Sequence, residues 1–363
     1  MAAHRYARAY IDLAAFRANL AVAKARAGAR AVYAVVKADA YGHGMAALAG
    51  AATAADGFCV ADLDEGLALR AVIPERPIVV LQGAHDRDGF AAARAAGLTL
   101  VLHQAEQVQR FLADAKSGAP APLPWLELDT GMHRLGLNET AFAEARQLLA
   151  PLFSDQAMTV MTHFACADTP AHTLHHAQRA RLATPPGLRR SACNSAALLA
   201  GEVLGDDIVR PGIMLYGGAS LADAAPAALG LQPVMTLTSR ILAVRTVPVG
   251  DSVGYGAAWT AQRVSRIATV ALGYGDGYPR TMPAGSPVLT AAGRAPLVGR
   301  VSMDSLAIDV TDLPTVGPGQ EVVLWGEGLA VDELAERQGT IGYELLTRLG
   351  PRVPRVLGGR PRG

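Results

Sequence analysis

The segment AVYAVV, residues 31–36, is the first of eight short apolar or β-rich runs in the first two-thirds of this 363-residue chain. Stretches rich in Ala, Arg and Leu lie between most of these runs and have helical character. Eight nearly continuous apolar strands that alternate with helices predict an eight-stranded α/β barrel of the TIM type, whose strands are buried on both faces. The other seven runs are GFCVA from Gly57, PIVVLQ from Pro77, LTLVL from Leu98, PWLEL from Pro124, AMTVMTHF from Ala157, RRSACNS from Arg189 and DIVRPGI from Asp207.

The texture of the sequence changes near Leu231. Segments such as TLTSRILAVRTV, RIATVAL, SLAIDV and EVVLW follow one another with Gly and Pro between them, which is typical of strands and turns. Helical spacing returns only in VDELAERQG and YELLTRL. We therefore predict an α/β + β chain with two domains, a barrel over residues 1–230 and a mostly β domain over residues 231–363.

Charge and hydropathy exclude two classes of partner. The chain has 33 basic and 32 acidic side chains, with no long run of one sign, so we expect no nucleic-acid partner. The N-terminus lacks the apolar core of a signal peptide, and no stretch reaches the roughly 20 apolar residues that span a bilayer. We expect a soluble cytoplasmic protein without a membrane contact.

Cysteine and histidine patterns predict no metal site. The three cysteines, Cys59, Cys166 and Cys193, have wide spacing that fits neither a disulfide framework nor a zinc site, so we expect free thiols. His172, His175 and His176 lie in a helical segment without nearby carboxylates or thiolates. We interpret them as a solvated helix face.

Polar residues gather where the predicted strands end, and in a barrel these ends form the open, functional face. The loops after strands seven and eight of such barrels often bind phosphate, and here they offer a hydroxyl, a helix start and a glycine backbone. We therefore expect a phosphorylated ligand. The residues at strand ends are Lys37 after the first run, Arg134 after the fifth, His163 after the sixth, Asn194 and Ser195 after the seventh, and Arg210, Gly212 and Ile213 after the eighth.

Lys37 is unusual because it follows an apolar strand directly. An ammonium group there must be paired, solvated or partly deprotonated, and burial lowers the pKa of a lysine and makes it a Schiff-base nucleophile. From this position alone, a lysine that extends to solvent at the barrel rim fits equally well.

The neighbouring motifs decide between these alternatives. AVVKADAYGHG, DTGMHRLG, THFACAD, CNSAA, VRPGIMLYG, VGYGAAW, LGYGDGYPR and VGRVSMD together resemble the alanine racemase family over nearly the whole chain and in the same order. The resemblance implies a barrel followed by a β domain and the cofactor pyridoxal phosphate. It also implies interconversion of L-alanine and D-alanine by two bases, which in a bacterium supplies D-alanine for peptidoglycan.

The resemblance implies roles for individual residues. Lys37 is expected to carry the cofactor and to act as the base on the D-side of the alanine α-carbon, and Tyr255 is expected to be the base on the opposite face. In this family the tyrosine comes from the partner subunit, which implies a homodimer with shared sites. Arg210 is expected to face the pyridine nitrogen. Tyr41, Ser195, Gly212 and Ile213 match phosphate-holding positions, His163 and Asn194 complete the cofactor site, Arg134 and Met303 lie near the substrate carboxylate, and Tyr274, Arg280, Asp168 and Asp304 line the entrance and inner site.

Two positions depart from the family pattern. Glu127 stands where many members have a lysine modified by CO₂, and we predict that its carboxylate pairs with Arg134 directly. Pro351 stands near the point where some members have a tyrosine that touches the phosphate, which predicts a wider entrance.

Two further functions fit parts of the pattern. A racemase of broader specificity, for instance towards serine, has the same fold, and a pocket for a small side chain discriminates one hydroxyl poorly. A non-catalytic pyridoxal-phosphate-binding protein needs the barrel and its lysine, but no second base on a β domain. The presence of Tyr255 argues against that function.

Overall fold

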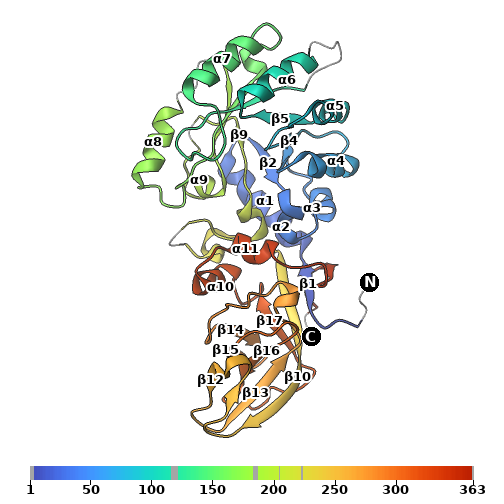
Figure 1. Cartoon of the computed structure of the whole chain (residues 1–363), viewed down its shortest axis with the longest axis vertical. Coiled ribbons are helices and arrows are strands. Elements are labelled where there is room, and N and C mark those ends of the chain that lie inside the picture. Colours follow the sequence, from blue (N-terminus) through green and yellow to red (C-terminus); the bar gives the residue numbers. More distant parts are fainter. Residues whose placement is uncertain (1–3, 116–121, 183–186, 204, 222–223, 362–363) are drawn as a thin grey trace.

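The computed structural model describes residues 4–115, 122–182, 187–203, 205–221 and 224–361. It shows an elongated molecule with a barrel at one end and a mostly β part at the other (Figure 1). Helices α10 and α11 lie where the two parts meet (Figure 1). The predicted fold class, an α/β barrel followed by a β domain, is confirmed.

All eight predicted barrel strands are present, and each pairs in parallel with its neighbours in the order β8-β7-β6-β5-β4-β3-β2-β9. Backbone hydrogen bonds from Asp207 N–H to Arg190 O and from Arg210 N–H to Cys193 O, both 2.9 Å, place β9 beside β8. The barrel is therefore nearly closed, and its apolar strands are buried on both faces. The strands are β2 (Ala31–Val35), β3 (Gly57–Val60), β4 (Ile78–Val80), β5 (Thr99–Leu102), β6 (Trp125–Glu127), β7 (Thr159–Met161), β8 (Arg189–Ser191) and β9 (Ile208–Val209).

Helices surround this barrel, and several begin at a polar cap. The carboxylates of Asp12, Asp62 and Asp86 accept backbone N–H groups at the starts of α1, α4 and α5, which satisfies donors that the helix itself leaves free. Asn138 and Asn194 cap α7 and α9 in the same way. The helices of this part are α1 (Leu13–Ala27), α2 (Lys37–Gly42), α3 (Met45–Ala51), α4 (Leu63–Val72), α5 (Arg87–Ala95), α6 (Ala105–Ala115), α7 (Glu139–Leu149), α8 (Thr173–Arg181) and α9 (Ser195–Leu199).

The second part is built on one long strand, β10 (Met235–Val247), which pairs with β1 and β17 in its first half and with β13 in its second half. An irregularity between Ile241 and Ala243 separates the halves, so the strand passes from one side of the sheet to the other. Trp325 and Tyr278 stack inside this part with ring centroids 6.0 Å apart. The other strands are β11 (Ser252–Val253), β12 (Trp259–Thr260), β13 (Ser265–Val270), β14 (Pro287–Thr290), β15 (Gly293–Val298), β16 (Leu306–Asp309), β17 (Glu321–Trp325) and β18 (Arg355–Leu357).

The start of the chain also contributes to the second sheet. Strand β1 (Arg8–Ile11) pairs antiparallel with β10 and parallel with β18, although it precedes the barrel in the sequence. Helices α10 (Val331–Gln338) and α11 (Gly342–Thr347) return from the β part towards the barrel, where α11 packs on α2. The boundary between residues 230 and 231 stays a prediction.

Candidate active site

A cavity of about 560 Å³ lies at the C-terminal ends of the barrel strands. Nine of the fifteen residues to which the family resemblance gave a role in the site line this cavity, although they come from distant parts of the chain. These nine are Lys37, Tyr41, Arg134, His163, Asn194, Ser195, Arg210, Gly212 and Ile213.

The backbone after Lys37 has an unusual conformation. Ala38, Asp39, Ala40 and Tyr41 all have φ between 50° and 54°, so α2 contains a left-handed helical turn rather than a right-handed one. For residues with a Cβ this conformation costs roughly 1–2 kcal/mol each, and it persists only where surrounding contacts impose it. The turn directs both Lys37 and Tyr41 to the cavity.

The electrostatic surroundings of Lys37 favour its neutral amine. Burial is the largest cause that lowers the pKa of Lys37, and the charges of Arg134 and Arg210 lower it further. A neutral amine is the form that attacks a carbonyl group and that accepts a proton from carbon.

Arg210 is held rigidly at the base of the cavity. Its Nε donates to Ser191 Oγ (2.9 Å) and one Nη donates to Thr162 O (2.6 Å), and the residue is only 4 % exposed. A guanidinium stays protonated at every physiological pH. The cavity therefore contains a fixed positive charge.

A small polar cradle, formed by Ser195, Gly212 and Tyr41, also lies in the cavity wall. The Ser195 hydroxyl accepts the Gly212 N–H at 2.8 Å, and the Tyr41 ring stacks on Tyr216 with centroids 4.5 Å apart. A Cβ at Gly212 would overlap the Tyr41 hydroxyl, so only glycine allows this close approach. Hydroxyl and backbone groups that converge on one point suit a phosphate.

His163 and Asn194 also line the cavity. Burial, followed by the charges of Arg210, Arg134 and Lys37, holds the pKa of His163 well below its ordinary value, so this imidazole is neutral. Asn194 caps α9 through its side-chain oxygen and donates to Phe164 O at 3.3 Å. The amide oxygen and the amide nitrogen of Asn194 are thus both bonded to the backbone of the protein.

The predicted direct pair between Glu127 and Arg134 is wrong for this structure. Both side chains line the cavity, but no ion pair joins them, and Glu127 Oε2 has no hydrogen-bond partner among the described residues. Burial raises the pKa of Glu127 to about 6, although Arg210 and Arg134 oppose this shift. The carboxyl group therefore interacts with Arg134 through its field and not through a contact.

The prediction that Pro351 lies at the cavity is also wrong. A tyrosine that the sequence did not single out, Tyr343, lines the cavity instead. Pro351 is exposed and does not line the cavity, whereas Tyr343 on α11 does, with its ring 5.8 Å from that of Tyr41. The tyrosine in YELLTRL was the available signal, but the sequence indicated only a helix for this segment. A tyrosine therefore lines the cavity beside Tyr41, but it comes from α11 and not from the Pro351 position.

A third correction concerns the histidines of α8. His175 is fully buried, and its Nε2 lies 2.5 Å from Glu202, so it is not part of a solvated face. His172 caps the same helix through its ring nitrogen. No group of three or more His, Cys, Asp or Glu side chains in the described ranges is arranged to hold a metal ion.

Three more predicted residues, Tyr255, Tyr274 and Met303, lie on the β part and do not line the cavity. Tyr255 follows β11 in a short 3₁₀ turn, and its side chain is 67 % exposed, while Met303 is 53 % and Tyr274 is 38 % exposed. Hydrogen bonds from Tyr274 N–H to Ser302 O (2.9 Å) and from Gly275 N–H to Met303 O (2.8 Å) join their loops. We treat these three exposed side chains as a second group of candidate site residues.

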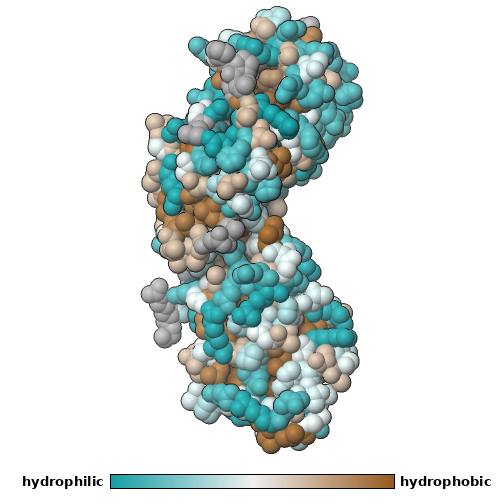
Figure 2. Space-filling model, turned by 90° about the vertical axis from the view of Figure 1, so that its left-hand side faces the viewer, coloured by the Kyte–Doolittle hydropathy of each residue, from teal (hydrophilic) through white to brown (hydrophobic). Residues whose placement is uncertain are grey.

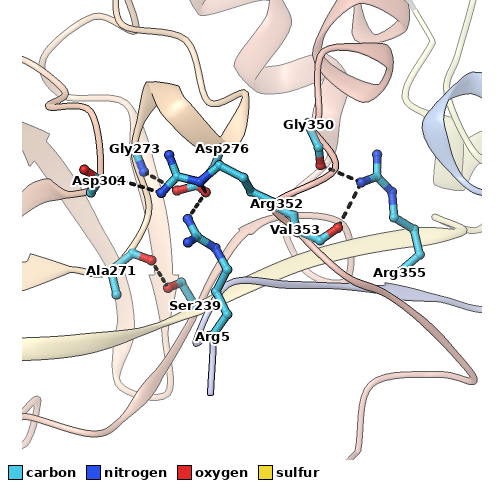
Figure 3. Close-up of polar contacts among 10 residues, drawn as sticks. All are labelled: Arg5, Ser239, Ala271, Gly273, Asp276, Asp304, Gly350, Arg352, Val353 and Arg355. Atoms are coloured by element: carbon cyan, nitrogen blue, oxygen red, sulfur yellow. Dashed lines mark hydrogen bonds and ion pairs between the residues drawn. The ribbon is translucent and has the colours of Figure 1, made fainter. Parts of the chain in front are cut away.

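A buried carboxylate holds these loops together (Figure 3). Asp276 is fully buried, accepts the Gly273 N–H at 3.1 Å, and forms ion pairs with Arg5 and Arg352. Arg352 also pairs with Asp304, the residue after Met303, so the ends of the chain fix the Tyr274 loop against the Met303 loop. Asp304 thus has a structural ion pair.

A wider cleft of about 890 Å³ adjoins the cavity and shares Asn194, His163 and Tyr343 with it. Its wall is rich in small apolar residues from the segments 164–167, 219–221 and 224–226 and also contains Asp168. Figure 2 shows hydrophobic surface on this side of the molecule, just above the level where the two parts meet. None of the helices in the described ranges combines the length and apolar character of a membrane span.

Comparisons with known proteins agree with this arrangement. The family model described as the alanine racemase N-terminal domain matches residues 11–220, and that of the alanine racemase C-terminal domain matches residues 234–357. The biosynthetic alanine racemase of Pseudomonas aeruginosa is 47 % identical over 355 residues, which cover 96 % of this chain and 98 % of that protein.

Solved structures extend the similarity to three dimensions. The crystal structure of biosynthetic alanine racemase from Pseudomonas aeruginosa superposes with a TM-score of 0.91 at 46 % identity and covers 98 % of this chain and 100 % of that one. The alanine racemase of Bartonella henselae, solved with covalently bound pyridoxal phosphate, gives a TM-score of 0.87 at 30 % identity, with 97 % and 99 % covered. The chain therefore belongs to the alanine racemase family.

Proposed function

We propose that this protein is an isomerase that interconverts L-alanine and D-alanine with pyridoxal phosphate attached to Lys37. The observation that carries the proposal is the barrel-end cavity, in which Lys37 has a lowered pKa and faces both a fixed arginine and a hydroxyl cradle. Family membership supports the same reaction.

The residues present fit pyridoxal phosphate. The phosphate would be held by the Ser195 and Tyr41 hydroxyls and by the backbone at Gly212 and Ile213. The absence of a side chain at Gly212 lets its backbone come close to the Tyr41 hydroxyl, so these groups converge. Lys37 would hold the aldehyde carbon covalently, and Arg210 would face the pyridine nitrogen. When bound, this cofactor supplies an electron sink for negative charge at the α-carbon.

The protein supplies the proton transfers and the charge pattern. Lys37 Nζ, whose pKa is lowered by burial and by Arg134 and Arg210, takes or returns the α-proton on the D-side, and Tyr255 Oη does so on the L-side. With the cofactor bound, the permanent charge of Arg210 would discourage protonation of the ring nitrogen, and this would favour simple reprotonation of the α-carbon over side reactions. Arg134 and the Met303 backbone would bind the substrate carboxylate, with Tyr274 at the entrance.

The exposure of the second group of residues supports a site that is shared between two copies of the chain. Tyr255, Tyr274 and Met303 are exposed here, and the cleft beside the cavity has an apolar wall. We infer a homodimer in which the β part of one subunit completes the cavity of its partner. Such an enzyme would act in the cytoplasm, where D-alanine is needed for peptidoglycan precursors.

The test follows the optical rotation of L-alanine with the purified chain and added pyridoxal phosphate, beside L-serine. We expect rotation to fall to zero on alanine without amine formation. Little change on serine would agree with specificity for alanine. A bound cofactor without any loss of rotation would favour the non-catalytic binding protein, and equal rates on both amino acids would favour a racemase of broader specificity.

A further inference from the structure

The left-handed turn after Lys37 needs groups that hold it from outside. Its residues Ala38 to Tyr41 are not glycine, so the free chain prefers other conformations. His43 Nδ1 lies 3.0 Å from Ala40 O and 2.9 Å from Tyr41 O, and Arg355 Nε donates to Gly42 O at 2.9 Å. These contacts hold the far end of the turn, next to Tyr41.

The near end of the turn, next to Lys37, is held by Glu65 of α4. Its Oε1 accepts the Ala38 N–H at 2.6 Å, and its Oε2 accepts the Ala61 N–H at 2.8 Å. A glutamate three residues after a helix N-cap ordinarily bonds back to the N-cap residue's own N–H. Here the carboxylate instead bridges the backbone after β2 to the backbone after β3, and Ala61 itself lines the cavity.

Glu65 also belongs to the electrostatic surroundings of Lys37. Its charge raises the pKa of Lys37 and thus opposes burial, Arg134 and Arg210, which all lower it. Asp62, the N-cap of the same helix, is exposed and bonds only to its own helix, at Glu65 N–H (2.9 Å). The two acids are close in sequence, but only Glu65 contacts the turn.

We propose that Glu65 is a positioning residue that fixes the left-handed turn and thereby directs the Lys37 amine and the Tyr41 hydroxyl into the cavity. This inference rests on the proposed function, because it takes Lys37 as the residue that carries the cofactor. Nothing in the reaction requires Glu65 to touch the substrate.

The test compares holoenzymes of the wild type, Glu65→Gln, Glu65→Asp and the matched control Asp62→Asn. Dissociation of pyridoxal phosphate is measured by dialysis and visible absorbance, and the pH midpoint of its covalent attachment is measured by the same absorbance. We expect Glu65→Gln to bind the cofactor about 10- to 100-fold more weakly, which is the effect of losing hydrogen bonds to a charged group. Its midpoint should move to lower pH, because the amine loses a neighbouring anion.

The other variants distinguish the length of the side chain at residue 65, its charge and the stability of α4. Glu65→Asp keeps the charge but shortens the side chain, so it should lose cofactor affinity without the shift in midpoint. Asp62→Asn should behave as the wild type in both measurements. Adding Ala38→Gly to Glu65→Gln should recover part of the affinity, because glycine adopts the left-handed conformation without strain.

The proposal is overturned if Glu65→Gln and Asp62→Asn retain the cofactor equally well, or if affinity falls only in proportion to the folded fraction measured by circular dichroism. Should Glu65→Gln fail to fold, the same comparison is made between Glu65→Asp and Asp62→Asn. Failure of the wild type itself to bind pyridoxal phosphate would instead refute the proposed function.

Discussion

The two groups of candidate site residues differ in how the fold treats them. Around Lys37, the barrel buries cations, fixes Arg210 with several hydrogen bonds and imposes a left-handed turn. On the β part, Tyr255, Tyr274 and Met303 are exposed, and the ion pairs of Asp276 and Arg352 fix the Tyr274 and Met303 loops. The group around Lys37 encloses a cavity within a single chain, whereas the side chains on the β part face solvent. The contrast favours a site that two copies complete.

The largest effect is expected when two inactive variants are mixed, because this tests whether the two groups of residues act from different subunits. Lys37→Ala and Tyr255→Phe each remove one base, and each should lower alanine racemisation by more than about 10²-fold. Unfolded together and refolded, they should regain up to about a quarter of the wild-type activity, because one site of each mixed dimer has both bases. Racemisation assays before and after mixing measure this gain.

Each variant refolded alone serves as the control. Should the mixture stay inactive while mixed dimers are detected by mass spectrometry of differently tagged chains, the two bases do not come from different subunits.

Loss of the Asp276 carboxylate should disturb the Tyr274 and Met303 loops more than the cavity around Lys37. Asp276→Asn leaves Arg5 and Arg352 without their buried partner and should lower the free energy of unfolding by about 1–3 kcal/mol. It should also raise the KM for alanine, because the Tyr274 and Met303 loops lose their fixed positions. Thermal denaturation and steady-state kinetics measure the two effects.

Asp312→Asn is the matched control, since Asp312 pairs with Arg263 at the surface of the same part. Equal KM values for Asp276→Asn and the wild type would show that the network serves stability alone.

Glu127→Gln should have the smallest effect on activity, and its effect on stability should depend on pH. Burial raises the pKa of Glu127 in the folded state to about 6, above its ordinary value of 4.5. A carboxyl group with a raised folded pKa contributes stability that is fully present below pH 4.5 and lost as the pH rises through about 6. The wild type should therefore lose about 2 kcal/mol relative to Glu127→Gln over this range.

Urea denaturation of both proteins at pH 4.5 and pH 7 gives this difference. In the same range the KM of the wild type for alanine should fall a few-fold, because ionised Glu127 attracts Arg134, whereas the KM of the variant should follow only the substrate's own titration. Parallel pH profiles for both proteins would remove Glu127 from the account.

The barrel and most of the cavity could be predicted from the sequence because their signals are local. Strands buried on both faces are continuous apolar runs, and a lysine such as Lys37 directly after such a run stands out. The left-handed turn could not be predicted, since Ala-Asp-Ala-Tyr is ordinary in a right-handed helix and the contacts that impose its conformation come from Glu65 and Arg355. Tyr343 and strand β1 were missed for a similar reason, because their partners lie hundreds of residues away in the sequence.

The central claim is that Lys37 and Tyr255 act on opposite faces of the alanine α-carbon. It is tested most directly by exchange of the α-hydrogen in D₂O, measured by proton NMR with the Tyr255→Phe variant and each enantiomer in turn. We predict that D-alanine still exchanges its α-hydrogen through Lys37, while L-alanine does not and racemisation falls by about 10²- to 10⁴-fold. Loss of exchange for both enantiomers to the same extent, or exchange of both, would contradict two bases on opposite faces.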